Sequence, residues 1–273
     1  GAILNLYLQQ KPSNEIDVLI GFLPSNQELG GKLLVTGEAN INLKNAFASG
    51  EQIALHWQQL QSKSPQLNLM FQKPYIFHSN LGIDGNFELY KRDSFFLNIQ
   101  AGLGLQYLFS AHESSRIFFQ TLSTHVLNVD TMQIKLSRKL PDIIDVSSLS
   151  LGLQYNFTKT SYRFNPRSGN ELEILLNVGN KKIHKNNTIL QLYDSTFHFE
   201  QVYDSLKLNS YRVTATASYA HYIPLGKQAA LKAALHAGWF QSDSYFTNEL
   251  FRLGGYKLLR GFDEESIYAN RYG

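Results

Sequence analysis

The 273-residue sequence has no cysteine, little charge and no long apolar segment, and each absence excludes a class of protein. Without cysteine there is no disulfide scaffold, no thiolate metal site and no cysteine nucleophile. Charged residues make up 17% of the chain, below the roughly 25% of typical soluble domains. No apolar run approaches the roughly 18 residues that a membrane-spanning helix needs. The net charge of +3, without a dense run of Lys and Arg, argues against nucleic acid as a partner.

The sequence is instead rich in aromatic residues, at 13%, and in stretches where apolar and polar residues alternate. Residues 95–109 alternate along their whole length, and 149–157, 211–223 and 229–239 repeat the pattern. A period of two residues is that of a β-strand with one apolar and one polar face. These segments are longer than the five or six residues of a typical soluble strand and approach or exceed the roughly 9–11 that cross a bilayer. We therefore predict an all-β fold, a transmembrane antiparallel β-barrel of the outer-membrane type, with a soluble β-sandwich as the alternative.

The spacing of the alternating segments predicts about eleven strands between residues 15 and 241. Short connections follow the even-numbered strands, and the long connections, 125–145, 180–206 and 242 onward, follow odd-numbered strands. Outer-membrane barrels have short periplasmic turns and long outer loops, so the first strand, about Glu15–Pro24, is predicted to run outward. In the loop 180–206, the side chains of Lys181, Lys182 and Lys185 are expected to be solvated or to contact lipopolysaccharide phosphates.

The end of the chain carries the motif Phe251-Arg-Leu-Gly-Gly-Tyr-Lys-Leu-Leu-Arg-Gly-Phe262, inside the long loop after the eleventh predicted strand. It resembles the Gly-Gly…Val/Leu-Arg-Gly-Phe signature of the BamA/TamA superfamily (the bacterial surface antigen family), whose barrels assemble or translocate outer-membrane proteins and follow POTRA domains. The stretch 155–169, with Pro166 and Gly169, resembles the family's strand eight and its Pro-x-x-Gly periplasmic turn. The resemblance extends over essentially the whole chain.

The resemblance implies a domain organisation. Residues 1–14 are expected to be the end of the last POTRA domain and its linker. Residues 15–273 are expected to be the N-terminal part of a barrel of about sixteen strands, comprising strands 1–11 and the loop after strand 11, and ending before strand 12. An eleven-strand sheet would present two unpaired edges to hydrocarbon, so we expect further strands beyond residue 273.

The resemblance also implies that this loop folds back into the barrel lumen and that Arg260 pins it there by bidentate bonds to acidic side chains. The alternative is local pairing of Arg260 with Asp263, Glu264 or Glu265. We expect its main partner beyond residue 273, and Arg252 is expected in the exposed part of the loop. Within the chain, the candidate partners are Asp84, Glu88 and Glu173. The loop latch motif comprises Gly254, Gly255, Leu259, Arg260, Gly261 and Phe262, and its glycines are expected to permit turns.

A lateral seam at strand one is the second site that the resemblance implies. In the family, the edge of this strand pairs weakly with the last strand, and an unpaired edge can template an incoming strand. The predicted function is insertion or translocation of β-barrel proteins at this seam; the alternative is a two-partner-secretion-type transporter or a passive outer-membrane pore. Expected partners in the bacterial outer membrane are its lipids, unfolded outer-membrane proteins, and periplasmic or lipoprotein accessory subunits. The seam strand comprises Ile16, Asp17, Val18, Leu19, Ile20, Gly21 and Phe22.

The sequence contains no catalytic constellation. None of the eight His residues has the spacing of metal ligands, and His56 and His236 fall on polar strand faces. No Gly-x-Ser-x-Gly elbow and no nucleotide-binding motif occurs. We predict neither enzymatic activity, nor a metal site, nor a cofactor.

Overall fold

A computed structural model describes residues 13–23, 34–59, 63–162, 165–226, 229–255, 259–262 and 266–273. The expected end of a POTRA domain, residues 1–14, lies outside the described residues apart from Ser13 and Asn14. No described helix is long and apolar enough to cross a membrane.

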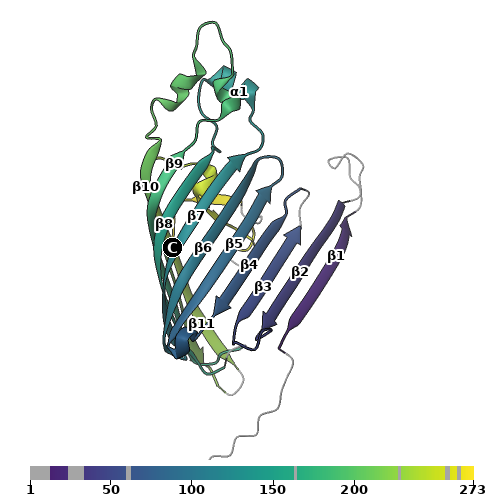
Figure 1. Cartoon of the computed structure of the whole chain (residues 1–273), viewed down its shortest axis with the longest axis vertical. Helices are drawn as coiled ribbons and strands as arrows, with labels where there is room; N and C mark the ends of the chain where they lie inside the picture. The colour runs from purple at the N-terminus through teal and green to yellow at the C-terminus, as the bar shows by residue number, and fades with distance from the viewer. Residues whose placement is uncertain are drawn as a thin grey trace, which may run out of the picture.

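Twelve strands form one antiparallel sheet in which each long strand pairs with the next strand along the chain (Figure 1). The all-β prediction and the eleven long strands are confirmed. One correction concerns the end of the chain, because Arg271–Tyr272 (β14) pairs with β11 at Gly238 and Trp239 and so begins a twelfth strand. Two residues are too few to show alternation, which is why the sequence pattern missed this strand. The long strands are β1 (Glu15–Leu23), β2 (Leu34–Lys44), β3 (Gln52–Gln59), β4 (Gln66–Lys73), β5 (Leu81–Arg92), β6 (Phe96–Ser110), β7 (Glu113–Val126), β8 (Val146–Thr160), β9 (Gly169–Ile183), β10 (Asn209–Pro224) and β11 (Ala230–Ser242).

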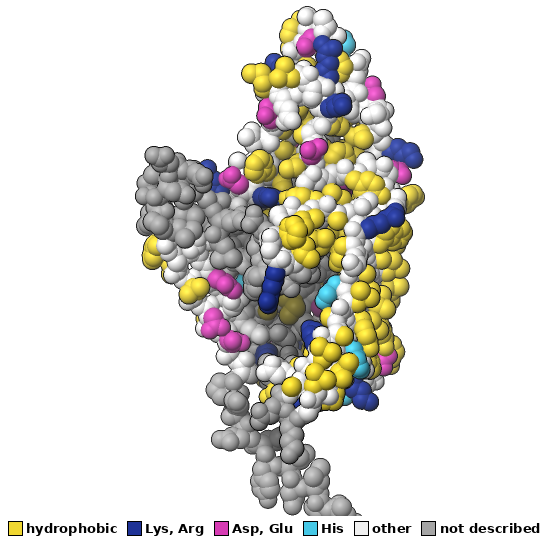
Figure 2. All heavy atoms as spheres, turned by 180° about the vertical axis from the view of Figure 1, so that it is seen from behind, with side chains coloured by type: hydrophobic (Ala, Val, Ile, Leu, Met, Phe, Trp, Pro, Cys, Tyr) yellow, Lys and Arg dark blue, Asp and Glu magenta, His cyan; other side chains and the backbone are white. Residues whose placement is uncertain are grey.

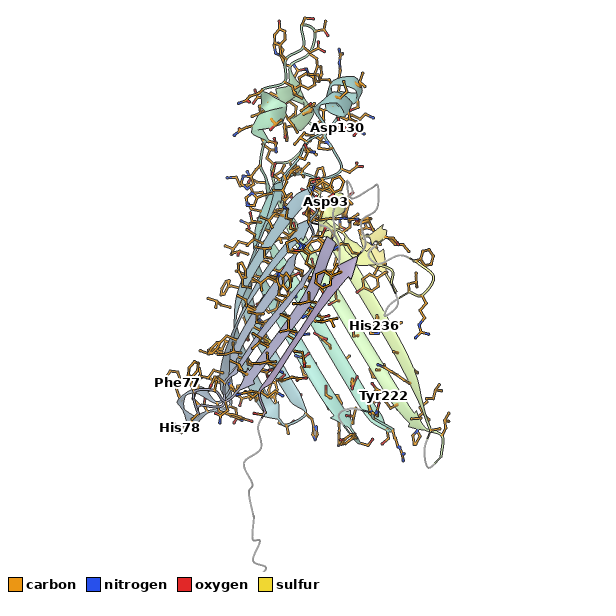
Figure 3. The ribbon with its side chains drawn as sticks, turned by 90° about the vertical axis from the view of Figure 1, so that its right-hand side faces the viewer. Phe77, His78, Asp93, Asp130, Tyr222 and His236 are labelled. Atoms are coloured by element: carbon orange, nitrogen blue, oxygen red, sulfur yellow. The ribbon has the colours of Figure 1, made fainter. Side chains whose placement is uncertain are left out.

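The two ends of the sheet differ as the loop lengths predict. At one end the connections are tight turns, and Phe77 and His78 mark this end in Figure 3, in the short helix η2 (Ile76–His78). In the β2–β3 turn, the Glu51 carboxylate accepts hydrogen bonds from the main-chain N–H groups of Phe47 and Ser49 and from the Ser49 hydroxyl. These bonds lower the Glu51 pKa to about 2, with the largest contribution from the Ser49 hydroxyl. The Glu51 carboxylate thus ties together the main chain of the turn.

At the other end, the loops after β7 and β9 fold together into a cap, on which Asp130 lies in Figure 3. The cap contains α1 (Thr131–Ser137), α2 (Asn187–Leu190) and η3 (Phe199–Tyr203). Asp130 and Asn186 cap the two helices by accepting hydrogen bonds from main-chain N–H groups. The cap and the strand ends below it share one apolar core, which comprises Ile134, Ile144, Val146, Ile183, Ile189, Phe199 and Tyr203.

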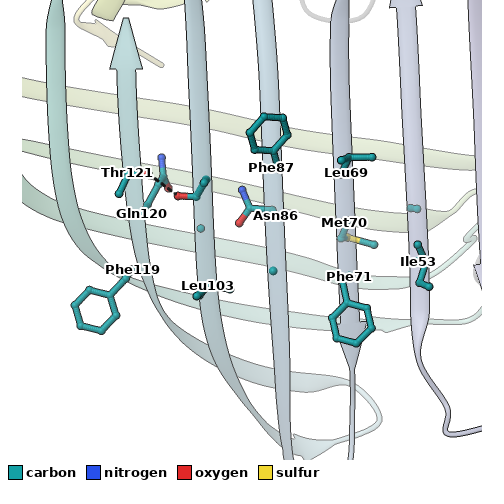
Figure 4. Close-up of a pocket in the computed structure, with 14 residues that line it drawn as sticks. Ile53, Leu69, Met70, Phe71, Asn86, Phe87, Leu103, Phe119, Gln120 and Thr121 are labelled. Atoms are coloured by element: carbon teal, nitrogen blue, oxygen red, sulfur yellow. Dashed lines mark hydrogen bonds between the residues drawn. The ribbon is translucent and has the colours of Figure 1, made fainter.

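The outward face of the sheet is apolar and matches the face predicted to contact lipid. Leu103, Phe119 and Leu235 are 73%, 61% and 61% exposed there, and Figure 2 shows hydrophobic side chains gathered along one side of the molecule, below the more mixed cap. A groove of about 630 Å³ crosses this face over β3 to β7 (Figure 4). It is open because Gly85 and Ala101 present little or no side chain between larger neighbours, including Phe71, Phe87, Leu103 and Phe119.

The inward face carries polar and charged side chains that pair with one another. Arg116 of β7 binds the Asp84 carboxylate of β5 with Nε at 2.8 Å and Nη2 at 2.5 Å. The Gln154 amide donates to Glu173 at 2.7 Å. The Phe118 ring fills the space over Gly152, where a Cβ would lie 2.1 Å from a ring carbon. The alternation of the sequence therefore separates a lipid face from a polar lumen face.

Candidate functional site

The seam strand β1 is an edge strand. In the part of the chain that the structure describes, β2 is its one neighbour, with Ile16 opposite Ile41 and Phe22 opposite Val35. Val18 is 64% exposed and Leu19, which points to the opposite face, is 68% exposed. The outer edge of β1 therefore presents a row of main-chain N–H and C=O groups, with apolar side chains on one face and Asp17 beside Leu19 on the other.

The chain after β11 folds back over the inward face of the sheet (yellow in Figure 1). It forms η4 (Thr247–Glu249) and a small hairpin of β12 (Phe251–Leu253) and β13 (Ile267–Ala269) before returning to β11 as β14. We call residues 243–270 the inner loop. Its rings also pack on the returning strand, because Phe251 and Tyr272 meet edge to face with centroids 5.0 Å apart.

The latch motif forms the turn region of the inner loop. Gly255 bridges to Leu259, and the Gly255 N–H donates to the Phe262 carbonyl at 3.2 Å. Gly254, Gly255 and Gly261 have φ of 113°, 99° and 93°, the conformations for which glycine was expected. Leu259, Arg260, Gly261 and Phe262 are exposed. The pinning role of Arg260 remains a prediction.

Arg252 does not lie in an exposed part of the loop, and this expectation was wrong. Its side chain is half-buried, and its guanidinium carbon lies 4.4 Å from the centre of the Tyr90 ring on β5. Arg92, two residues further along the same strand, lies over the Tyr268 ring at 5.7 Å and donates to the Tyr268 hydroxyl. The small hairpin is thus held against the outer end of β5 by two reciprocal Arg–Tyr contacts.

Lys181 is not a solvated loop residue either. Strand β9 continues to Ile183, so Lys181 points inward from the strand, and its side chain and that of Glu249 are both 0% exposed. The Lys181 ammonium binds Glu249 Oε2 at 2.5 Å and the Ser244 carbonyl at 2.9 Å, with the Phe246 ring centre 5.1 Å away. Burial raises the pKa of the Glu249 carboxyl above its ordinary value, and the ammonium acts in the opposite direction.

Residues 45–272 match the family model described as the Omp85 superfamily domain. The chain belongs to the Omp85 superfamily. The resemblance to the BamA/TamA superfamily is thereby confirmed. Among solved structures, 53 chains match this Omp85 chain. One is the crystal structure of BamA from Haemophilus ducreyi lacking POTRA domains 1–3, with 16% identity and a TM-score of 0.57. That match covers 95% of this chain and 47% of the other, so this chain spans about half the length of that relative. No curated protein matches.

Two of the three acidic strand residues considered for Arg260, Asp84 and Glu173, already have partners in this Omp85 sheet. Asp84 is bound by Arg116, and Glu173 accepts from Gln154. The lumen side chains of the described strands therefore form a network of their own. The alternative local partners of Arg260, at positions 263–265, lie outside the described residues. An acidic partner of Arg260 beyond residue 273 remains a prediction.

The second family motif forms the tight β8–β9 turn. Pro166 lies within it, and the N–H groups of Arg167 and Ser168 donate to the Ser161 hydroxyl at 3.0 Å and 3.2 Å. Gly169 has φ of 116°, and a Cβ there would lie 2.1 Å from the Lys159 carbonyl oxygen. The motif is thus explained by backbone geometry.

The histidine and acidic side chains in the described part of the Omp85 chain do not gather into a metal site. No group of three or more His, Cys, Asp and Glu residues in that part could hold a metal ion. His56 lies against Asn40 and Gln58, and His236 against Ser218, as ordinary members of the polar face.

Proposed function

We propose that this Omp85 chain is the N-terminal part of the barrel of a bacterial outer-membrane protein that inserts or translocates β-barrel proteins, and that the substrate adds to the free edge of β1. The observation that carries the proposal is this edge, nine residues long, with one neighbour in the described residues and with exposed apolar side chains. Nine residues are about the length of one membrane crossing.

The edge supplies a physical route for insertion. Unpaired N–H and C=O groups in hydrocarbon each cost several kcal/mol, roughly as any unsatisfied buried polar group does. An incoming strand satisfies them by β-augmentation. Release follows when the substrate's own last strand closes its sheet, because closure leaves no edge to hold. The proposed partners are therefore unfolded outer-membrane proteins, lipids and the periplasmic or lipoprotein subunits that deliver the substrate. The proposal requires no enzymatic step.

Site-specific photo-crosslinking in the full-length protein tests this. A photoreactive residue at Val18 should capture a nascent outer-membrane protein, whereas one at Leu103, on the same face and more exposed, should capture none. Capture at Gln154 in the lumen, without capture at Val18, would instead support a two-partner-secretion-type transporter. Absence of substrate at all three positions would contradict both and leave a passive pore.

A further inference from the structure

We propose that the inner loop is a strut that ties the β9–β10 wall to β5 at the cap end of the barrel, and that Lys181 and Glu249 are the positioning residues that hold it. Two sets of contacts made by the described part of the loop lie far apart along the sheet, one with β9 and the cap and the other with β5. The consequence for the seam, given at the end, rests on the proposed function.

The first end of the strut is the buried Lys181–Glu249 pair. Three consecutive loop residues are fixed there, because the Thr247 N–H donates to the Asp142 carbonyl at 2.8 Å and the Asn248 amide donates to the Ile144 carbonyl at 3.2 Å. Glu249 then pairs with Lys181. The loop is therefore held by the wall and by the cap at once.

A second cation strengthens the preference of this place for Glu249. Arg212 of β10 lies inside the wall, with its guanidinium carbon 5.1 Å from the centre of the Phe240 ring. Its charge favours the ionised form of Glu249. The buried Lys181 and the half-buried Arg212 thus both act on one buried carboxylate, and removal of that carboxylate would leave Lys181 buried without its compensating charge.

The second end of the strut is the hairpin on β5. Arg252 comes three residues after Glu249 in the chain and reaches Tyr90, and Tyr268, directly opposite Arg252 in the hairpin, meets Arg92. The hairpin is short and antiparallel, so a shift of Glu249 is transmitted to both Arg–Tyr contacts. The β14 strand then returns the chain to β11.

The strut joins strands that the sheet itself connects only through β6, β7 and β8. It connects two separated strands of the curved β5–β11 wall across the inward face and so fixes the curvature of that wall. Opening at the seam is then taken up by β1 to β4. In this way the loop directs movement to the edge that the proposed function uses.

Pulsed EPR distances in the full-length protein test the strut. The chain has no cysteine, so it adds no competing label sites to cysteine pairs at Lys91 on β5 with Tyr211 on β10, and at Ile20 on β1 with Tyr211. We expect a narrow 91–211 distance distribution that broadens in Glu249→Gln, and a 20–211 distribution that is broad in both proteins. The charge swap Lys181→Glu with Glu249→Lys should narrow the 91–211 distribution again only in part, because the ammonium at position 249 would then meet the charge of Arg212.

The matched control is Glu200→Gln, which removes the exposed Lys185–Glu200 pair of the cap and should leave the 91–211 width unchanged. If Glu249→Gln does not assemble, Tyr268→Leu loosens the other end and should broaden the same distance. An unchanged 91–211 width in the variant that assembles would overturn the strut. Capture of substrate at Val18 is measured separately. Failure of the strut proposal therefore leaves the seam proposal intact, and failure of the seam proposal leaves the strut proposal intact.

Discussion

The seam side of the sheet, β1 to β4, and the braced side, β5 to β11, are built from the same alternating pattern but differ in length and cover. Strands β1, β3 and β4 have nine, eight and eight residues, whereas β8, β9 and β10 have 15, 15 and 16. On the braced side the inner loop covers the polar face and the cap covers the strand ends. One alternating pattern thus gives a side of long strands covered by loops and a side of shorter strands that ends in an edge.

The largest change in the free energy of unfolding is expected when the buried Lys181–Glu249 pair on the braced side is broken. Glu249→Gln should reduce the free energy of barrel unfolding by about 3–5 kcal/mol, because Lys181 would remain buried without a counter-charge. The measurement is denaturant unfolding of the full-length barrel in detergent or liposomes. The control is Glu200→Gln, which breaks the exposed Lys185–Glu200 pair of the cap and should change the free energy of unfolding little. Equal effects at the two positions would remove the distinction between a braced and an exposed pair.

A smaller loss of unfolding free energy is expected when a side chain is added at Gly152, and almost none when one is added at Gly85. Gly152→Leu places a side chain where the Phe118 ring lies and should cost about 1–3 kcal/mol by overpacking. Gly85→Leu points into the open lipid-side groove, where the nearest side-chain atom lies 3.4 Å from a Cβ, and should be tolerated. Unfolding of both variants checks this, and a greater loss from Gly85→Leu would reverse our assignment of the inward and outward faces.

Substitutions of Arg260 test whether the latch motif helps to hold the inner loop on the braced side. Arg260→Ala should lower outer-membrane protein levels and barrel heat-modifiability, and Arg260→Lys should rescue poorly because an ammonium lacks the planar two-pronged contact. Arg252 is unsuitable as the control, since it packs on Tyr90. Arg167→Ala, in the exposed β8–β9 turn, replaces it. Wild-type behaviour of Arg260→Ala in both assays would leave the strut as the means of holding the loop.

The smallest change is expected on the seam side, where protonation of Glu51 should loosen the β2–β3 turn. The folded-state pKa of Glu51 is about 2 against an ordinary 4.5, so its stabilisation of the turn is present above pH 4.5 and is lost as the pH falls through 2. Limited pepsin cleavage beside the exposed Phe47 measures this. Cleavage should rise towards pH 2 in the wild type and be raised throughout this range in Glu51→Gln. A wild-type rate that is flat between pH 4.5 and 2 would contradict it.

The sequence predicts the sheet well because its strands depend on local alternation. The turn glycines of the latch and of the β8–β9 turn were found for the same reason, since a positive φ is a local requirement. The charged contacts were missed. Lys181 pairs with a residue 68 positions later, and Arg92 meets a residue 176 positions later. Nothing in either neighbourhood indicates a partner at that separation.

The separation between Lys181 and Glu249 also sets an order of assembly. Every pairing between long strands joins neighbours in sequence, so the sheet can grow hairpin by hairpin at low entropic cost. Lys181 lies on β9 and Glu249 follows β11, so the two meet only when the β9–β10 and β10–β11 pairings have placed the intervening chain. We therefore expect docking of the inner loop, and burial of Lys181 with it, to follow the pairing of these strands.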